Sequence, residues 1–135
     1  MNRSDFLKSL TTDIAAFATG GLKALTPEEP RWLLLGEMPV AGYKYYIGKK
    51  IEHLMEPGKE LSLKREPENE YDEAAIAVYF NKIKIGYLPH AENATIALLM
   101  DQQANVAATI SDFDPNAGPW ERVWVEVRMR GNYLI

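Results

Sequence analysis

Short segments in which apolar and polar residues alternate begin after Pro30 and continue almost to the end of the chain. This period of two is typical of strands with one buried face, and the segments are rich in β-branched and aromatic residues. The predicted strands are RWLLLGE (31–37), PVAGYKYYIG (39–48), ELSLKR (60–65), AAIAVYF (74–80), KIKIGYL (82–88), VAATISDF (106–113) and RVWVEVRM (122–129). A sheet of so many short strands is expected to curl or close, because open sheet edges attract other chains.

A single helix is expected to interrupt these strands. Between Pro89 and Gln103, the residues Ile96, Leu99 and Met100 fall on one helical face, and a proline suits the first turn of a helix. The pair Asn81-Lys82 predicts a hairpin turn between two of the strands. The sequence therefore predicts a mainly β (α+β) domain, a curled sheet or β-barrel of about six strands with one inserted helix.

The first 29 residues follow a helical pattern instead. Ser4 is a candidate N-cap, Gly20-Gly21 a candidate stop, and the apolar residues on one stripe between them are Phe6, Leu10, Ile14 and Phe17. The charged and proline-bearing segment LTPEEPRW (25–32) follows this amphipathic helix. Two regions are predicted: residues 1–29 as helix and linker, and residues 30–135 as the β domain.

The N-terminal helix has two possible uses. The segment NRSDFLK resembles a degenerate twin-arginine export signal, but Ser4 replaces the second arginine and Asp13 interrupts the apolar stretch. The alternative is a helix that docks on the domain or on a protein partner. Because of these two departures we expect a cytoplasmic protein, with export as the alternative. No apolar run reaches the roughly 18 to 20 residues that span a bilayer.

Composition limits the chemistry. The chain has no cysteine, which excludes disulfides, thiol chemistry and cysteine-ligated metal sites. Its net charge of -4 argues against non-specific coating of nucleic acid, which needs many phosphate contacts. The segment from Lys44 to Arg65 is nevertheless locally basic. The acids that follow it lack the glycine and the spacing of a calcium loop, so we expect no metal, no cofactor and no enzyme activity; they are Glu66, Glu68, Glu70, Asp72 and Glu73.

Three segments, in this order, resemble the HIRAN domain family. VAGYKYYIG (40–48) is similar to a family strand with a basic residue, paired tyrosines and two glycines. LKREPENEYDEAAIAV (63–78) is similar to the family's Arg, acid, Pro, x, Asn, x, Tyr, Asp signature with the strand after it. KIGYLPHAENATIALLMD (84–101) is similar to an Ile-Gly-x-Leu strand that leads into a helix. The resemblance covers about residues 39–112, and more loosely the last strand.

The resemblance implies a small OB-like barrel that binds the 3' end of single-stranded DNA without catalysis, in DNA repair or processing. It implies a site of eight residues, which are Lys44, Tyr45, Tyr46, Arg65, Asn69, Tyr71, Asp72 and His90. The rival interpretation is a protein-interaction or exported envelope protein that keeps the barrel but has lost DNA binding.

Three of the implied residues lie together in the acidic loop. Asp72 would accept a hydrogen bond from a terminal 3'-hydroxyl and repel a 3'-phosphate, or else cap a turn. Tyr71 would stack on a base, or plug the end of the barrel. Asn69 would donate to a phosphate, or occupy a left-handed turn position.

The remaining implied residues would bind phosphates and bases. Strand alternation would place Lys44 and Tyr46 on one face, with one of Tyr45 and Tyr46 in the core and the other in the groove. Arg65 would reach a phosphate or form a salt bridge with Glu66, Asp72 or another acid. His90, near a helix start, would donate to a phosphate or face solvent.

Overall fold

The computed structural model describes residues 31–131. The N-terminal helix, its linker and the export-like segment lie outside the described residues, and so do their predicted roles. Within residues 31–131, no helix has the length and apolar character needed to cross a membrane.

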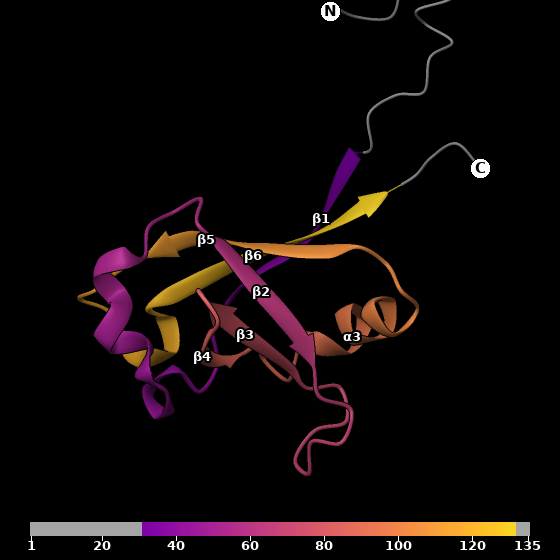
Figure 1. Cartoon of the computed structure of the whole chain (residues 1–135), viewed down its shortest axis with the longest axis horizontal. Helices are drawn as coiled ribbons and strands as arrows, with labels where there is room; N and C mark the ends of the chain where they lie inside the picture. The colour runs from indigo at the N-terminus through magenta and orange to yellow at the C-terminus, as the bar shows by residue number, and fades with distance from the viewer. Residues whose placement is uncertain (1–30, 132–135) are drawn as a thin grey trace, which may run out of the picture. The chain divides into compact units, whose positions relative to one another are not determined.

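Six strands of the described region form one antiparallel sheet (Figure 1). They are β1 (Arg31–Pro39), β2 (Glu60–Arg65), β3 (Ile76–Phe80), β4 (Ile83–Tyr87), β5 (Val106–Phe113) and β6 (Val123–Gly131). The strand order is β1-β6-β5-β2-β3-β4, so the first strand pairs with the last, from Arg31 opposite Gly131 to Pro39 opposite Trp124. The helices are α3 (Asn93–Asp101) and three 3-10 helices, η1 (Tyr43–Tyr45), η2 (Ile47–Leu54) and η3 (Pro119–Glu121).

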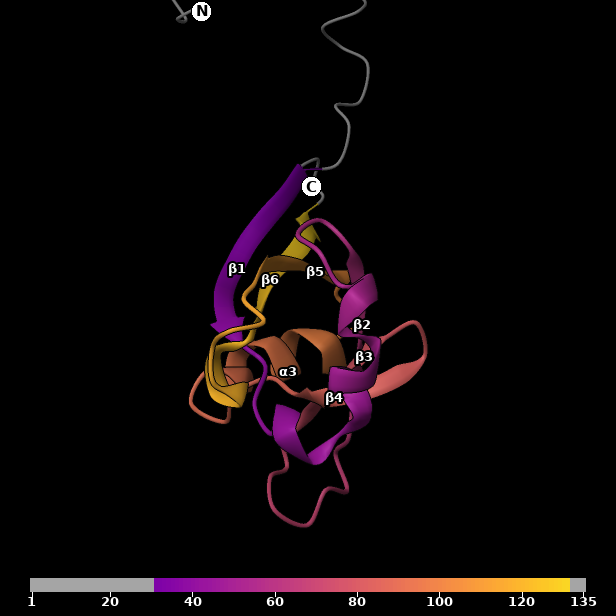
Figure 2. The same cartoon turned by 90° about the vertical axis from the view of Figure 1, so that its left-hand side faces the viewer.

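The sheet is curled but not closed. Figure 2 shows β1 and β3 on opposite sides of the curl. The edge strands β1 and β4 do not pair with each other, yet Ala41, just after β1, forms one bridge with Tyr87 of β4. Its two N–H···O=C distances are 2.7 and 2.9 Å. The predicted curled sheet of about six strands with one inserted helix is therefore confirmed, and the closed barrel is not formed.

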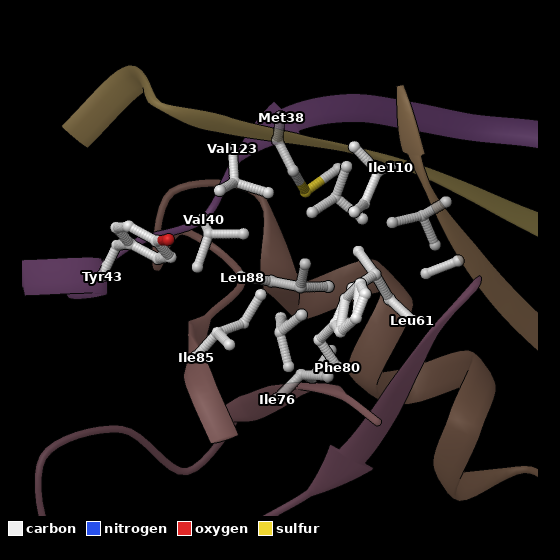
Figure 3. Packing of buried hydrophobic residues seen from close by; sticks show 14 of the residues in the cluster. Met38, Val40, Tyr43, Leu61, Ile76, Phe80, Ile85, Leu88, Ile110 and Val123 are labelled. Carbon is white, nitrogen blue, oxygen red and sulfur yellow. The ribbon is translucent and has the colours of Figure 1, made fainter. Parts of the chain in front are cut away.

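The core fills the inside of this curl. Figure 3 shows Met38, Val40, Ile85, Leu88 and Phe80 pointing toward one another from different elements. The three valines of β6 at 123, 125 and 127 are at most 1% exposed, as their alternation predicted. Full burial of each such side chain stabilises the fold by roughly 1.5 to 3 kcal/mol.

Most of the predicted elements form close to their predicted bounds. β2 and β5 match them, and the turn between β3 and β4 places Asn81 and Lys82 at φ 47° and 68°, as a type I′ turn requires. The predicted helix is present but begins at Asn93. Residues 90–92 form a turn in which the N–H of Glu92 donates to the carbonyl of Pro89 at 3.0 Å, which delays the helix start.

The predicted strand 39–48 is wrong, because η1 and the start of η2 occupy this segment. Gly42 adopts a left-handed φ of 70°, which turns the chain out of the extended conformation. The side chains of residues 43–46 therefore do not alternate between two faces as a strand would require. Tyr43, only 2% exposed, is the core tyrosine, whereas Tyr45 is 76% exposed and Tyr46 is half-buried.

A polar cluster fixes this irregular segment. The Tyr43 hydroxyl donates to Oε2 of Glu52 at 2.7 Å, and Arg122, just before β6, donates to the same oxygen at 3.2 Å. Burial and the bond to Glu52 raise the pKa of Tyr43, so the hydroxyl stays protonated as the donor. The cluster ties η1 and η2 to the start of β6 and so sets where Tyr45 and Tyr46 lie.

Candidate functional site

The loop between β2 and β3 projects from the sheet (Figure 1) and borders a pocket of about 460 Å³. The pocket is lined by Ala41, Tyr46, Asn69, Glu70, Tyr71, Asp72, Ala75, Tyr87, Leu88 and His90. Five of the eight predicted site residues are in this lining, and Lys44, Tyr45 and Arg65 are not. Among the described residues that line the pocket, none is a lysine or an arginine.

Asp72 is the most strongly hydrogen-bonded carboxylate of the pocket. Its Oδ2 lies 3.0 Å from Nδ1 of His90 and accepts from Nδ2 of Asn93 at 2.7 Å, and its Oδ1 accepts from the N–H of Ala74 at 2.9 Å. The bonds from His90 and Asn93, helped by Ala74, lower the pKa of Asp72 to about 2. The carboxylate is therefore ionised at neutral pH and acts as an acceptor only.

Asn69 organises the loop backbone. Its Oδ1 accepts from the N–H groups of Tyr71 at 2.9 Å and Asp72 at 3.2 Å, and its Nδ2 donates to Oε1 of Glu66 at 3.1 Å. The left-handed turn position, which was the alternative role for Asn69, is not found, because the non-glycine residues with positive φ in the described region are Asn81, Lys82 and Gln103. Asn69 thus shapes the turn through its side chain rather than through φ.

Aromatic rings form two sides of the pocket. Tyr71 is 88% exposed, so its ring is presented to solvent rather than used to plug the sheet. Tyr46 and Tyr87 meet edge to face with ring centroids 6.1 Å apart. Lys84 places its Nζ 5.3 Å from the centroid of the Tyr46 ring and 4.2 Å from that of Tyr87. The site therefore offers one free aromatic face and one supported aromatic wall.

Lys44 and Tyr45 directly precede Tyr46 and lie outside the lining. Both are exposed, and Lys44 holds its Nζ 5.0 Å from the centroid of the Tyr45 ring. This pair combines a positive charge with a stacking surface beside the Tyr46 wall.

Arg65 has structural partners. Its Nε and Nη2 donate to the two carboxylate oxygens of Asp101 at 2.9 and 3.1 Å. Its Nη1 donates to the carbonyl of Ala75 at 2.6 Å, and Nη2 also donates to that of Glu73 at 3.0 Å. The guanidinium joins the end of β2, the returning end of the loop and the end of α3. Of the alternatives raised for this residue, the geometry matches a salt bridge, with Asp101 as the acid.

We expect the variant Arg65→Lys to lower the free energy of unfolding by roughly 1 to 2 kcal/mol, because an ammonium cannot reproduce the fork that bonds Asp101 and two carbonyls. Urea denaturation followed by circular dichroism measures this change. Lys64→Arg, at the exposed neighbouring position, is the control and should leave the midpoint unchanged. An unchanged midpoint for Arg65→Lys would show that the fork does not hold the loop.

Sequence reasoning missed four residues that support the pocket, namely Glu66, Lys84, Tyr87 and Asn93. Lys84 donates to Glu66 at 3.0 Å and to the Tyr87 hydroxyl, which donates to Glu66 at 2.8 Å. Asn93 is 2% exposed and bonds Asp72 from the start of α3. An asparagine at the edge of a predicted helix was the available signal for Asn93. The other contacts join β4 to the start of the loop after β2, and the sequence does not specify that these two segments meet.

The loop acids have different surroundings. Glu70 lines the pocket, Glu68 is exposed outside the lining, and Glu66 is paired with Lys84. Only part of the acidic loop therefore faces the site. In the region from 31 to 131, no three His, Asp or Glu side chains gather closely enough to hold a metal ion.

Comparisons with known proteins agree with this architecture. A crystal structure of a protein from Lactobacillus plantarum aligns with a TM-score of 0.66 and 23% identity, over 76% of this chain and 98% of that one. A crystal structure of the HIRAN domain of human HLTF aligns with a TM-score of 0.58 and 23% identity, over 76% of this chain and 81% of that one. No curated protein matches the chain. The family model of the HIRAN domain matches residues 34–130. The chain therefore belongs to the HIRAN domain family.

Proposed function

We propose that this domain is a non-catalytic module that binds the 3'-hydroxyl end of single-stranded DNA, in DNA repair or processing. Family membership supports nucleic-acid binding in general, because HIRAN domains occur in helicase-like DNA repair proteins. The observation that carries the finer proposal is the ionised Asp72 carboxylate beside the exposed ring of Tyr71. Together they supply an acceptor for a hydroxyl and a face for a base.

The charge of the pocket favours an end without a terminal phosphate. Asp72 and Glu70 are in the lining, with no lysine or arginine among the described lining residues. A 3'-phosphate placed there would meet like charges at short range, which is costly. Backbone phosphates further along the strand would instead contact exposed lysines outside the pocket, for which Lys44, Lys49 and Lys50 of η1 and η2 are candidates.

Fluorescence anisotropy tests this proposal directly. Two oligonucleotides of the same sequence carry a 5' fluorophore and end in either a 3'-hydroxyl or a 3'-phosphate. The hydroxyl end should bind at least about tenfold more tightly, since a few kcal/mol separate a bonded from a repelled end. Equal affinity for both ends would contradict end recognition, and absence of binding to either would contradict DNA binding.

Lys44→Ala is expected to weaken binding to both ends by the same factor. An exposed lysine contributes to affinity through a phosphate, whose charge is independent of the terminal group. The plot of log K against log salt should become shallower by about 0.7, the value for one phosphate contact to a single strand. Lys59→Ala is the control, because Lys59 lies 3.7 Å from Glu56 and is already paired. A loss confined to the hydroxyl end would contradict a phosphate role for Lys44.

A second candidate is a protein ligand that presents a cationic group. Tyrosines at 46, 71 and 87 surround the pocket together with Glu70 and Asp72, and ring faces with carboxylates also attract an ammonium group. Titration with a lysine-rich peptide in the same assay would favour this candidate if the peptide binds and neither oligonucleotide does. Cell fractionation with sequencing of the mature N-terminus would test the exported variant of this interpretation.

A further inference from the structure

The side chain of Glu66 connects the two sides of the pocket. Its Oε2 accepts from Nζ of Lys84 at 3.0 Å, and its Oε1 accepts from the Tyr87 hydroxyl at 2.8 Å and from Nδ2 of Asn69 at 3.1 Å. The side chains of Glu66 and Lys84 are each 24% exposed. Burial alone would raise the pKa of Glu66, but the bonds from Tyr87 and Lys84 lower it, so the carboxylate is charged.

Through Asn69, Glu66 acts on the loop wall of the pocket. An asparagine amide has one donor end and one acceptor end. Because Nδ2 of Asn69 faces Glu66, its Oδ1 faces the backbone, where it accepts from the N–H groups of Tyr71 and Asp72. The orientation of the amide therefore depends on an acceptor at position 66. The loop is also closed at this point, since the N–H of Glu66 donates to the carbonyl of Ala75 at 3.0 Å.

Through Lys84, Glu66 acts on the aromatic wall. Lys84 lies near the rings of both Tyr46 and Tyr87 and donates to the Tyr87 hydroxyl. The charge of Glu66 keeps this ammonium in place, and the ammonium in turn supports the edge-to-face pair of tyrosines. One carboxylate thus holds elements on both sides of the site.

We infer that Glu66 is a positioning residue, whose bonds to Lys84, Tyr87 and Asn69 fix the two walls of the pocket, and that it strengthens DNA binding despite its negative charge. The binding part of this inference rests on the proposed function. The expected change in DNA affinity on removal of the Glu66 charge is a decrease. Simple electrostatics gives the opposite expectation, because removal of an acid near the site strengthens binding of a polyanion. The sign of the effect therefore separates the two explanations.

Glu66→Gln is the main variant, with Glu68→Gln as the matched control. Each removes one negative charge from the same loop, but Glu68 is exposed outside the lining. In Glu66→Gln the new amide must turn its NH₂ toward Lys84 or toward Asn69 and Tyr87, which are all donors in the present arrangement. We expect affinity for the 3'-hydroxyl oligonucleotide to fall about fivefold to tenfold, and the preference over the 3'-phosphate to shrink. Glu68→Gln should bind as the wild type does or slightly more tightly.

Amide hydrogen exchange by NMR gives a readout that is independent of DNA. The Tyr71 and Asp72 amides should exchange faster in Glu66→Gln than in the wild type. In Glu68→Gln they should exchange at the wild-type rate. Tyr87→Phe removes one donor to Glu66 while keeping the ring, and serves as a milder variant if Glu66→Gln does not fold. Faster exchange with weaker binding supports the inference, and unchanged exchange with binding equal to Glu68→Gln overturns it. If the wild type binds neither oligonucleotide, the proposed function fails, and the exchange rates alone decide whether Glu66 positions the loop.

Discussion

Replacement of Asp72 by alanine is expected to abolish discrimination between 3'-hydroxyl and 3'-phosphate ends. The variant loses the acceptor for the hydroxyl and the charge that repels the phosphate. Affinity for the hydroxyl end should fall by roughly one to two orders of magnitude, because a hydrogen bond to a charged group contributes about 1.5 to 3 kcal/mol. Anisotropy titration with the two oligonucleotides measures both effects.

Asp72→Asn separates the two contributions at this position. The amide keeps one acceptor oxygen for Asn93, whose buried side chain would otherwise lose its partner, but it carries no charge. The 3'-phosphate oligonucleotide should bind Asp72→Asn more tightly than it binds the wild type. If both Asp72 variants kept the wild-type preference, recognition of the end would have to lie elsewhere.

The low pKa of Asp72 sets the pH range of this effect. With a folded pKa of about 2, below the ordinary value of 3.8, the carboxylate stays ionised throughout the range in which such titrations are run. Its bonds stabilise the folded state above about pH 4, and this contribution is lost as the pH falls through 2. Loss of end preference at mildly acid pH would therefore not come from Asp72.

Gly86→Ala is expected to have the largest effect on stability, lowering the free energy of unfolding by about 2 to 4 kcal/mol. Gly86 has a φ of +152°, and a Cβ there would lie 2.4 Å from the carbonyl oxygen of Ala41 and 2.5 Å from a methyl of Val40. The first of these atoms is backbone, so the segment after β1 must move away. The bridge between Ala41 and Tyr87 would break, and urea denaturation would report the loss.

Gly58→Ala is the matched control for Gly86→Ala. Gly58 also has a positive φ, +94°, but no atom lies within 4 Å of a Cβ built on it. Only the backbone strain of an alanine at positive φ remains, which costs about 1 kcal/mol. Equal losses for the two variants would mean that strain, and not the close approach of Ala41 to Gly86, determines the effect.

Local patterns predicted the parts of the fold that depend on local physics. The alternation of valines in β6 identified a buried face, and Asn81-Lys82 identified a turn. The strand prediction for YKYYIG was wrong. Its tyrosines favour a strand, but the left-handed Gly42 and the burial of Tyr43 against Glu52 and Met55 impose 3-10 turns. A tertiary contact outweighed a weak propensity there.

The same limit applies to the site. Asn69, Tyr71 and Asp72 were predictable because the motif places them in one loop. The residues that hold this loop in place were not predictable, because the partners are far apart in the sequence. Lys84 lies 18 residues from Glu66, and Asn93 lies 21 residues from Asp72. Which strand or helix brings such partners together depends on the sheet order, and the order β1-β6-β5-β2-β3-β4 is not encoded in any single segment.

The pairing of the first described strand with the last also has a consequence for biosynthesis. β1 lies at the edge of the sheet and finds its neighbour in β6, which is made last of the six. While the ribosome is still translating β2 to β5, Met38, which is 2% exposed in the folded domain, lacks its β6 partner Val125. Such long-range pairing slows folding and exposes the nascent chain to aggregation. The sheet can therefore be completed only after Gly131, the last residue of β6, has been synthesised.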